Sequence, residues 1–293
     1  MARSNKENYS SGSWYPSELE LGRQKIRSQQ ARKRIVIATL SSVFVLGSLV
    51  IFVISSPGWE LFKQTYLDFD YGLEVLPIVA RGITTNIRLT IIASILITIL
   101  ALLLALARTS KAAALTPFRI LATVYVDVFR GVPLLLVILL VGFGIPALGI
   151  KGLTGNVLIL GTIAVVLTYS AYVAEVFRSG ILSIHPSQRA AARSLGLTQA
   201  QAMRYVILPQ AVKRVIPPLL NDLVALIKDT GLVSILGVID AVRAAQIQTS
   251  KTFNYTPYIV AAILFLIITV PLTRFTDRAL QKSIAEQNSQ GTT

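Results

Sequence analysis

Two pairs of charged side chains lie inside segments that are otherwise apolar. Asp127 and Arg130 are three residues apart in one segment, and Lys228 and Asp229 are adjacent in another. Ionisable groups are costly at membrane depth, so they usually face a cavity and mark a substrate or ion path. They can also neutralise one another as salt bridges within a helix bundle, and the sequence leaves both roles open.

A helix break is predicted beside each pair. Gly131 and Pro133 follow the first pair, and proline removes a backbone donor while glycine loosens the turn. Thr230 and Gly231 follow the second pair, near the middle of its apolar run. Interrupted helices at mid-membrane expose helix ends that can hold a charged substrate group. Both pairs are therefore expected to line a cavity.

Two further apolar runs carry polar side chains. Glu175 follows Tyr172 by three residues near the end of one run, where packing or snorkelling explains a carboxylate as well as substrate contact does. Hydroxyl side chains on nearly one face of another run favour close helix packing over a substrate path. These hydroxyl residues are Thr85, Thr90, Ser94 and Thr98. The residues predicted to line the substrate path are Asp127, Arg130, Tyr172, Glu175, Lys228, Asp229 and Thr230.

The composition indicates which elements position these residues. Apolar residues make up 53% of the chain and charged residues 14%, whereas roughly 25% of an ordinary soluble domain is charged. Six runs approach the ~20 apolar residues that cross a bilayer. They are residues 35–54, 87–107, 120–143, 157–177, 215–239 and 255–273. The predicted fold is an all-α integral membrane protein with about six transmembrane helices, the first an anchor rather than a cleavable signal.

The basic residues are divided unevenly among the segments between these runs. With the N-terminus taken as cytoplasmic, 20 of the 28 Lys and Arg residues lie on the cytoplasmic side and 5 on the other. This is a positive-inside distribution, and it predicts that both termini are cytoplasmic. It also explains the net charge of +14 without nucleic-acid binding, because no basic stripe with interleaved aromatic residues remains.

The cytoplasmic loop at residues 178–214 is patterned as two short helices. Helix-forming residues end at Gly196, which is placed as the C-terminal stop of the first helix. Thr198 and Gln201 have the spacing of a capping box that begins the second helix, and Pro209 is expected to close it. A paired-helix loop of this kind is suited to docking a soluble partner.

This loop resembles the EAA loop of the membrane subunits of ATP-binding-cassette (ABC) importers. The resemblance rests on the alanines at 190–192, on Gly196 and on the Val206-Ile-Leu-Pro209 segment, although Ala190 stands where the family usually has glutamate. Residues 125–135, 169–175 and 227–234 are similar to the branch that imports polar amino acids, and the similarity covers residues 82–284. The resemblance implies these ATPase-coupling residues: Arg189, Ala190, Ala191, Ala192, Leu195, Gly196, Leu197, Leu208 and Pro209.

Composition, hydropathy and charge divide the chain outside residues 82–284, whereas the resemblance implies the permease core within them and a set of partners. The segments are a flexible basic cytoplasmic tail (1–34), an accessory transmembrane helix (35–54), an extracytoplasmic loop (55–81), a five-helix permease core (82–284) and a flexible tail (285–293). The implied partners are nucleotide-binding ATPase subunits, a second permease subunit that is identical or related, an extracytoplasmic solute-binding protein, the amino-acid substrate and membrane lipid. The implied location is the bacterial cytoplasmic membrane.

The residue inventory offers no catalytic machinery. The chain has no phosphate-binding G-x-x-x-x-G-K-[ST] motif and no cysteine, and its single histidine, His185, is read as a solvated or capping residue. No catalytic residue, cofactor or metal is therefore expected on this chain, and ATP and Mg²⁺ would be used by the ATPase partner. The alternative is a non-transporting membrane scaffold, which has no need to bear the desolvation cost of intramembrane charges. Which polar amino acid is carried stays open, because both signs of charge occur in the predicted path.

Overall fold

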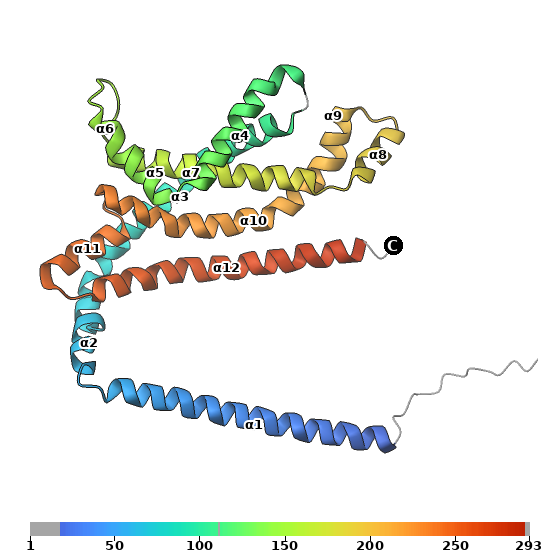
Figure 1. Ribbon diagram of the computed structural model, residues 1–293. Coiled ribbons are helices and arrows are strands. Elements are labelled where there is room, and N and C mark those ends of the chain that lie inside the picture. Colours follow the sequence, from blue (N-terminus) through green and yellow to red (C-terminus); the bar gives the residue numbers. More distant parts are fainter. Residues whose placement is uncertain (1–17, 111, 291–293) are drawn as a thin grey trace, which may run out of the picture. The chain divides into compact units, whose positions relative to one another are not determined.

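The computed structural model describes residues 18–110 and 112–290. Every regular element in these residues is helical and none of them forms a strand, which confirms the all-α prediction (Figure 1). The chain divides into two compact units, Met1–Phe62 and Lys63–Thr293. The first unit contains α1 (Glu18–Ile54) and the start of α2 (Trp59–Tyr66).

The second unit holds the remaining helices. They are α3 (Phe69–Thr109), α4 (Thr116–Gly131), α5 (Leu134–Leu139), α6 (Ile145–Ala147), α7 (Val157–Leu182), α8 (Pro186–Ser194), α9 (Gln199–Ala202), α10 (Leu208–Asp229), α11 (Ala241–Thr252) and α12 (Thr256–Gln290). Shorter helical segments lie between some of them: η1 (Ala113–Leu115), the π-helical η2 (Leu140–Gly144) and η3 (Met203–Ile207), and the 3₁₀ segment η4 (Thr230–Leu236). Within this unit α7 and α10 run side by side, and α8 and α9 lie beyond the end of α7 (Figure 1).

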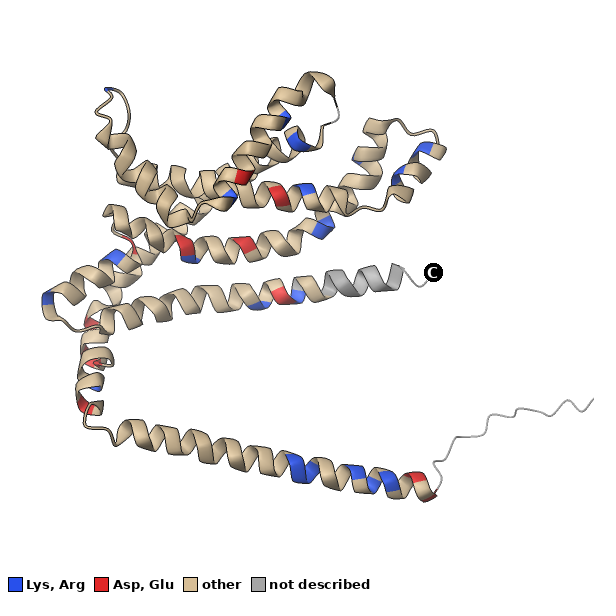
Figure 2. Cartoon of the chain, in the orientation of Figure 1, with Lys and Arg blue, Asp and Glu red and all other residues tan. Residues whose placement is uncertain are grey.

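α1 is one continuous helix of 37 residues. Its basic residues gather in its first half, and its second half is free of charge (Figure 2). The prediction of a flexible tail was wrong for residues 18–34, because that stretch is rich in Glu, Gln, Lys, Arg and Ala, which are strong helix formers. Residues 1–17 of the predicted tail lie outside the described residues.

α3 begins well before the predicted span. The stretch at 55–81 was expected to be a loop, but α3 starts at Phe69. The reason is a buried stripe of Val75, Val79 and Ile83, which are spaced four apart and therefore lie on one helix face. This stripe faces α11 and α12, where Val79 and Ile83 pack with Ala241, Ala245 and Ala261.

Both predicted helix breaks are confirmed. α4 ends at Gly131 and α5 begins at Leu134, and the chain bends by 105° between these two helical parts. α10 ends at Asp229, where the 3₁₀ segment η4 takes over. Among the described residues, four helices are long and apolar enough to span a membrane, and the bent pair would be a fifth. The predicted span at 215–239 is not a fifth continuous helix, because α10 carries polar and charged residues and then breaks.

The chain end also differs from the prediction. Residues 285–293 were expected to form a flexible tail, but α12 continues as far as Gln290. Residues 291–293 lie outside the described part of the chain.

Small side chains bring α3 close to its neighbours. Ala93, Ala101 and Ala105 of α3 are fully buried, as is Ala164 of α7, so the helices can approach closely. At Gly82 the contact is with backbone, since a Cβ atom there would lie 2.6 Å from the carbonyl carbon of Asp240. The start of α11 therefore touches α3 directly.

A buried polar network joins α3 to the break in α10. The side chain of Asn86 is 1% exposed, and its Nδ2 donates to Thr230 Oγ1 at 3.2 Å and to Asp240 Oδ2 at 3.0 Å. Its Oδ1 accepts from the backbone N–H of Ala241 at 3.1 Å. Asp240 Oδ1 in turn accepts from the N–H of Arg243 at 2.8 Å and caps α11. One amide side chain therefore fixes both η4 and α11 to α3.

Candidate functional site

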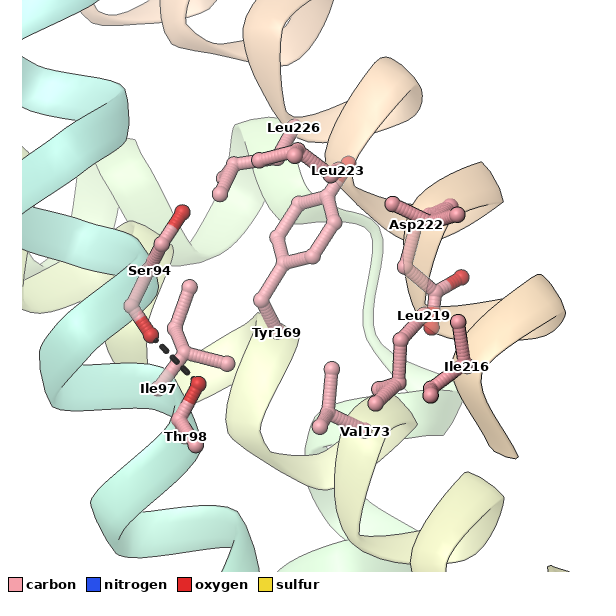
Figure 3. A pocket seen from close by; sticks show the side chains of 11 residues that line it. Ser94, Ile97, Thr98, Tyr169, Val173, Ile216, Leu219, Asp222, Leu223 and Leu226 are labelled. Carbon is pink, nitrogen blue, oxygen red and sulfur yellow. Dashed lines mark hydrogen bonds between the residues drawn. The ribbon is translucent and has the colours of Figure 1, made fainter. Parts of the chain in front are cut away.

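A cavity of about 290 Å³ lies between α3, α7 and α10 (Figure 3). This volume is close to the lower limit of roughly 300 Å³ for small-molecule sites. Its lining is mostly aliphatic, with a few polar groups, and consists of Ser94, Ile97, Thr98, Tyr169, Val173, Ile216, Leu219, Leu220, Asp222, Leu223 and Leu226. Figure 3 shows the ring of Tyr169 between the α3 residues on one side and the α10 residues on the other.

The polar groups of the cavity differ in how well they are satisfied. The hydroxyl of Tyr169 donates to Asp229 Oδ2 at 2.7 Å. Asp222 Oδ2 and Ser94 Oγ, in contrast, are shielded from solvent and have no hydrogen-bond partner among the described residues. A shielded carboxylate oxygen without a donor is unfavourable, and an ammonium or guanidinium group would supply the donor and the opposite charge. The cavity is therefore suited to a small molecule with a cationic group.

Asp222 was missing from the predicted substrate path. It lies in the same apolar run as Asp229 and seven residues before it, so the two carboxylates are two turns apart on one helix face. That spacing was the signal available in the sequence. The hydroxyl face of α3 also divides: Ser94 and Thr98 line the cavity, whereas Thr90 is buried and donates to a backbone carbonyl.

The residues predicted around the break in α10 have different surroundings. Asp229 lies next to the cavity through its bond with Tyr169. Thr230 is fully buried and belongs to the Asn86 network. Lys228 is exposed. Of these three, only Asp229 is hydrogen-bonded to a residue that lines the cavity, and none of the three lines it directly.

Glu175 is the centre of an arginine cluster. Its Oε2 lies 2.8 Å from an Nη1 of Arg108 and 4.0 Å from Nη1 of Arg130, and both carboxylate oxygens accept from Nε of Arg178 at 3.0 and 3.1 Å. Tyr172 OH donates to the carbonyl of Arg130 at 3.4 Å. Glu175 is thus engaged in ion pairs that join α3, α4 and α7.

The same cluster decides the partner of Arg130. The sequence left two roles open for Asp127 and Arg130, and in one of them Asp127 neutralises the charge of Arg130 on the same helix face. In the described ion pairs Arg130 is matched with Glu175 instead, and both Asp127 and Arg130 are exposed. They lie outside the α3–α7–α10 cavity.

The loop between α7 and α10 is the predicted two-helix bracket, defined here as α8, α9 and η3. Gly196 has φ +81°, a left-handed conformation that favours glycine. Its N–H donates to the carbonyl of Arg193 at 2.9 Å, and the N–H of Leu197 donates to the carbonyl of Ala192 at 3.2 Å. These two bonds form a Schellman motif, so the predicted helix stop at Gly196 is confirmed.

The start of α9 is also as predicted, but its end is not. Thr198 N–H donates to Gln201 Oε1 at 2.9 Å and Gln201 N–H to Thr198 Oγ1 at 3.3 Å, which completes the capping box. Pro209 does not close the helix. The chain passes through the π-helical η3 into α10, whose first turn contains Pro209. Proline is tolerated there because the N–H it lacks is one that a first helical turn leaves unused.

The bracket presents a partly apolar outer surface. Ala190 and Ala191 are exposed, as are Leu195 at 83% and Leu208 at 45%. Arg189 and Leu197 are half-buried, and Ala192 is buried at 3%. His185 caps α8 by accepting from the N–H of Ser187, as its capping interpretation predicted.

The bracket is fastened to the two helices that flank it. Ile184, Ile207 and Ala211 form a small core of their own, to which Ile181 and Met203 add. In addition, Arg214 Nη1 donates to the carbonyl of Ser183 at 2.7 Å. A displacement of the bracket would therefore be passed to both α7 and α10.

Comparisons with known proteins agree with this arrangement. Residues 112–284 match the family described as "Binding-protein-dependent transport system inner membrane component". The chain is 32% identical over 219 residues to the arginine transport system permease protein ArtQ of Bacillus subtilis (strain 168), covering 74% of this chain and 97% of that protein.

Solved structures show the same fold. The crystal structure of an amino acid ABC transporter with histidines matches with a TM-score of 0.68 and 34% identity, over 73% of this chain and 98% of that chain. The inward-facing MetNI methionine ABC transporter matches with a TM-score of 0.56 over 70% of this chain and 96% of that chain. At 18% identity this second likeness concerns the fold alone.

Proposed function

Because the chain belongs to the binding-protein-dependent transport system inner membrane component family and is the permease subunit of an amino-acid ABC importer, we propose that its α3–α7–α10 cavity accepts the amino acid. The chain is a multi-pass protein of the cytoplasmic membrane and is not itself catalytic. The scaffold alternative is not favoured, because the relatives are transport permeases.

The observation that carries this proposal is the unpartnered Asp222 carboxylate in the cavity. Every free amino acid offers an ammonium group, and arginine, which the name of ArtQ mentions, offers a guanidinium as well. Either group would satisfy Asp222, while the aliphatic lining would accept the carbon chain. Asp229, held by Tyr169, supports a site for the positively charged end of a polar amino acid.

The other predicted path residues belong to the path in a pair of permease subunits. Asp127, Arg130, Tyr172 and Lys228 are all exposed in the single chain. A second permease subunit, identical or related, would cover such surfaces and enclose them in a shared path. Exposure of charged groups beside helix breaks supports this arrangement, since discontinuous helices commonly line transport sites.

Replacing Asp222 with Asn tests the cavity. We expect uptake of the amino acid into reconstituted vesicles to fall about tenfold or more, because a charge-assisted hydrogen bond becomes a neutral one and each ~1.4 kcal/mol is a factor of ten. The matched control is Asp277→Asn in α12, where the carboxylate is exposed and outside the cavity. Uptake kinetics of Asp222→Asn equal to those of the control, in equally stable complexes, would remove Asp222 from the site.

The bracket is the proposed contact for the ATPase. Family membership implies ATPase and binding-protein partners in general. The exposed Leu195, Ala190 and Ala191 would dock the nucleotide-binding subunit. That subunit would use the ATP and Mg²⁺, and no cofactor is proposed for this chain. Because Ala190 carries a methyl group where the importer family usually has glutamate, the contact on this side is apolar. The solute-binding protein would deliver substrate at the opposite face of the membrane.

Replacing Gly196 with Val tests the bracket. A β-branched residue strains the left-handed backbone at φ +81° and displaces α9 from α8, so we expect loss of copurification with the ATPase subunit. The matched control is Gly152→Val, at φ +94° in the loop between α6 and α7. Both glycines have open space around a Cβ atom. Normal ATPase binding by Gly196→Val would rule out a docking role, whereas failure of both variants would point to general misfolding.

The proposed orientation places both termini and the bracket in the cytoplasm. Single cysteines can report it, since the chain has none of its own. We expect a cysteine at Lys151 to react with an impermeant thiol reagent in intact cells, and a cysteine at Arg193 to react only after permeabilisation. Strong labelling at position 193 in intact cells would reverse the topology.

The first helix is proposed to be an accessory anchor outside the path. α1 ends at Ile54, before the matched residues 112–284 begin. Its basic first half supports a role in fixing topology through anionic headgroups.

A further inference from the structure

A second cavity, of about 320 Å³, lies where the end of α3 meets α4 and α7. It is lined by Arg108, Arg119, Ile120, Thr123, Val124 and Arg178. Arg108 is in the last turn of α3, Arg119 in the first turn of α4, and Arg178 near the end of α7. The cavity is therefore at the helix ends, on the side where α7 leads into the bracket.

Positive charge exceeds negative charge around this cavity. In the described ion pairs, Glu175 is shared by Arg108, Arg178 and, at 4.0 Å, Arg130. Arg119 is held by a backbone carbonyl and a threonine hydroxyl, each at 3.3 Å, rather than by a described carboxylate. The side chain of Arg108 is only 11% exposed, so water compensates its charge poorly. An anion would balance the remaining charge.

The guanidinium groups favour a phosphate. Arginine presents a planar fork of N–H donors that binds phosphate oxygens through two parallel hydrogen bonds. The bonds to Glu175 leave further donors on Arg108 and Arg178, and Nε of Arg119 is not used in its two bonds. Donors from three separate helices can therefore meet one phosphate group.

The neighbouring surface favours a lipid as the source of that phosphate. The side of α4 near the cavity exposes large apolar side chains: Phe118 at 62%, Ile120 at 56%, Leu121 at 66% and Val124 at 54%. A free phosphate has no use for such a surface, whereas an acyl chain would lie along it. Basic pockets between transmembrane helices at a membrane face are suited to anionic lipid head groups.

We propose that the cavity of Arg108, Arg119 and Arg178 binds the phosphate of an anionic phospholipid, whose acyl chain lies along α4. The bound lipid would hold the start of α4 against the ends of α3 and α7. This site is separate from the α3–α7–α10 cavity, with which it shares no lining residue.

The test uses the full permease purified with its ATPase partner and examined by native mass spectrometry. Phosphatidylglycerol and phosphatidylcholine are added at equal concentrations, and inorganic phosphate is added as competitor. Arg119→Gln removes one guanidinium and leaves the Glu175 ion pairs intact. Ile120→Glu, at an exposed position, adds a negative charge at the rim. Arg243→Gln is the control, since this arginine bonds to Gln246 away from the cavity.

We expect the unaltered complex to retain phosphatidylglycerol over phosphatidylcholine. Arg119→Gln should weaken phosphatidylglycerol binding by roughly fivefold, the effect of one basic residue near an anionic membrane, and Ile120→Glu should weaken it at least as much. Arg243→Gln should leave it unchanged. Equal retention in all three variants would overturn the proposal. Displacement of the lipid by an equal concentration of inorganic phosphate would also overturn it, by assigning the cavity to a free anion. The experiment measures lipid binding and not uptake. Its result therefore tests the lipid site independently of the proposed transport site.

Discussion

Replacing Glu175 with Gln is expected to lower the free energy of unfolding of the permease by about 3 kcal/mol, the lower end for breaking a buried ion pair. The side chain of Glu175 is 20% exposed and that of Arg108 is 11% exposed, so loss of the carboxylate leaves a poorly hydrated guanidinium without its partner. Arg178 and Arg130, at 32% and 43% exposure, contribute less because solvent screens them. The melting temperature of the purified complex, monitored by size-exclusion chromatography, reports this decrease in the free energy of unfolding.

A rescue variant separates charge from packing in this prediction. The double variant Glu175→Gln with Arg108→Gln removes both charges, so its melting temperature should recover part of the way toward that of the unaltered protein. Glu74→Gln is the control, because this glutamate lies on the exposed side of α3. A melting temperature for Glu175→Gln within one degree of the control would show that the cluster adds no stability.

Replacing Asn86 with Leu is expected to lower the free energy of unfolding about as much as Glu175→Gln does. The new side chain keeps the branched arrangement of heavy atoms but leaves the N–H of Ala241 and Oδ2 of Asp240 without the partners they have now. Unsatisfied buried groups cost about 1–3 kcal/mol each, and more when charged. We therefore expect a loss of about 3 kcal/mol, or roughly 5–10 °C in melting temperature for a chain of this size, together with loosening of η4 from α3.

The charged member of the network allows a further check. Adding Asp240→Asn to Asn86→Leu removes the buried charge while keeping a side-chain oxygen to cap α11, so the double variant should be more stable than Asn86→Leu alone. Asn221→Leu, on the exposed side of α10, is the matched control. If the melting temperature of Asn86→Leu equals that of the control, the network is not what holds the broken helix in place.

The elements that depend only on residues close together along the chain could be predicted from the sequence. Gly196 stops α8, and Thr198 with Gln201 starts α9, because helix caps are made by residues within one turn of each other. The breaks after Arg130 and at Asp229 were predictable for the same reason, since Pro133 and the polar residues interrupt their own helices. The four long apolar helices followed from hydropathy alone.

Some local predictions failed where tertiary contacts extend a helix. α3 begins at Phe69 because Val75, Val79 and Ile83 bury against helices that are far along the chain. Pro209 continues a helix because it lies in the first turn of α10, directly after the π-helical η3. Ile207 and Ala211, on either side of it, pack against Ile184. Hydropathy windows and breaker residues carry no information about those contacts.

The site itself was only partly present in the sequence. By itself the sequence determined that this chain is a helical membrane permease with a two-helix bracket, since hydropathy, charge distribution and caps are local properties. Only the tertiary structure decided which charges meet: Arg108 and Glu175 are 67 residues apart, and Asn86 and Asp240 are 154 apart. It also separated Asp222, which faces a cavity, from Lys228, which is exposed. Burial and pairing depend on which helices pack together, and side chains distant in sequence acquire their partners only through that packing.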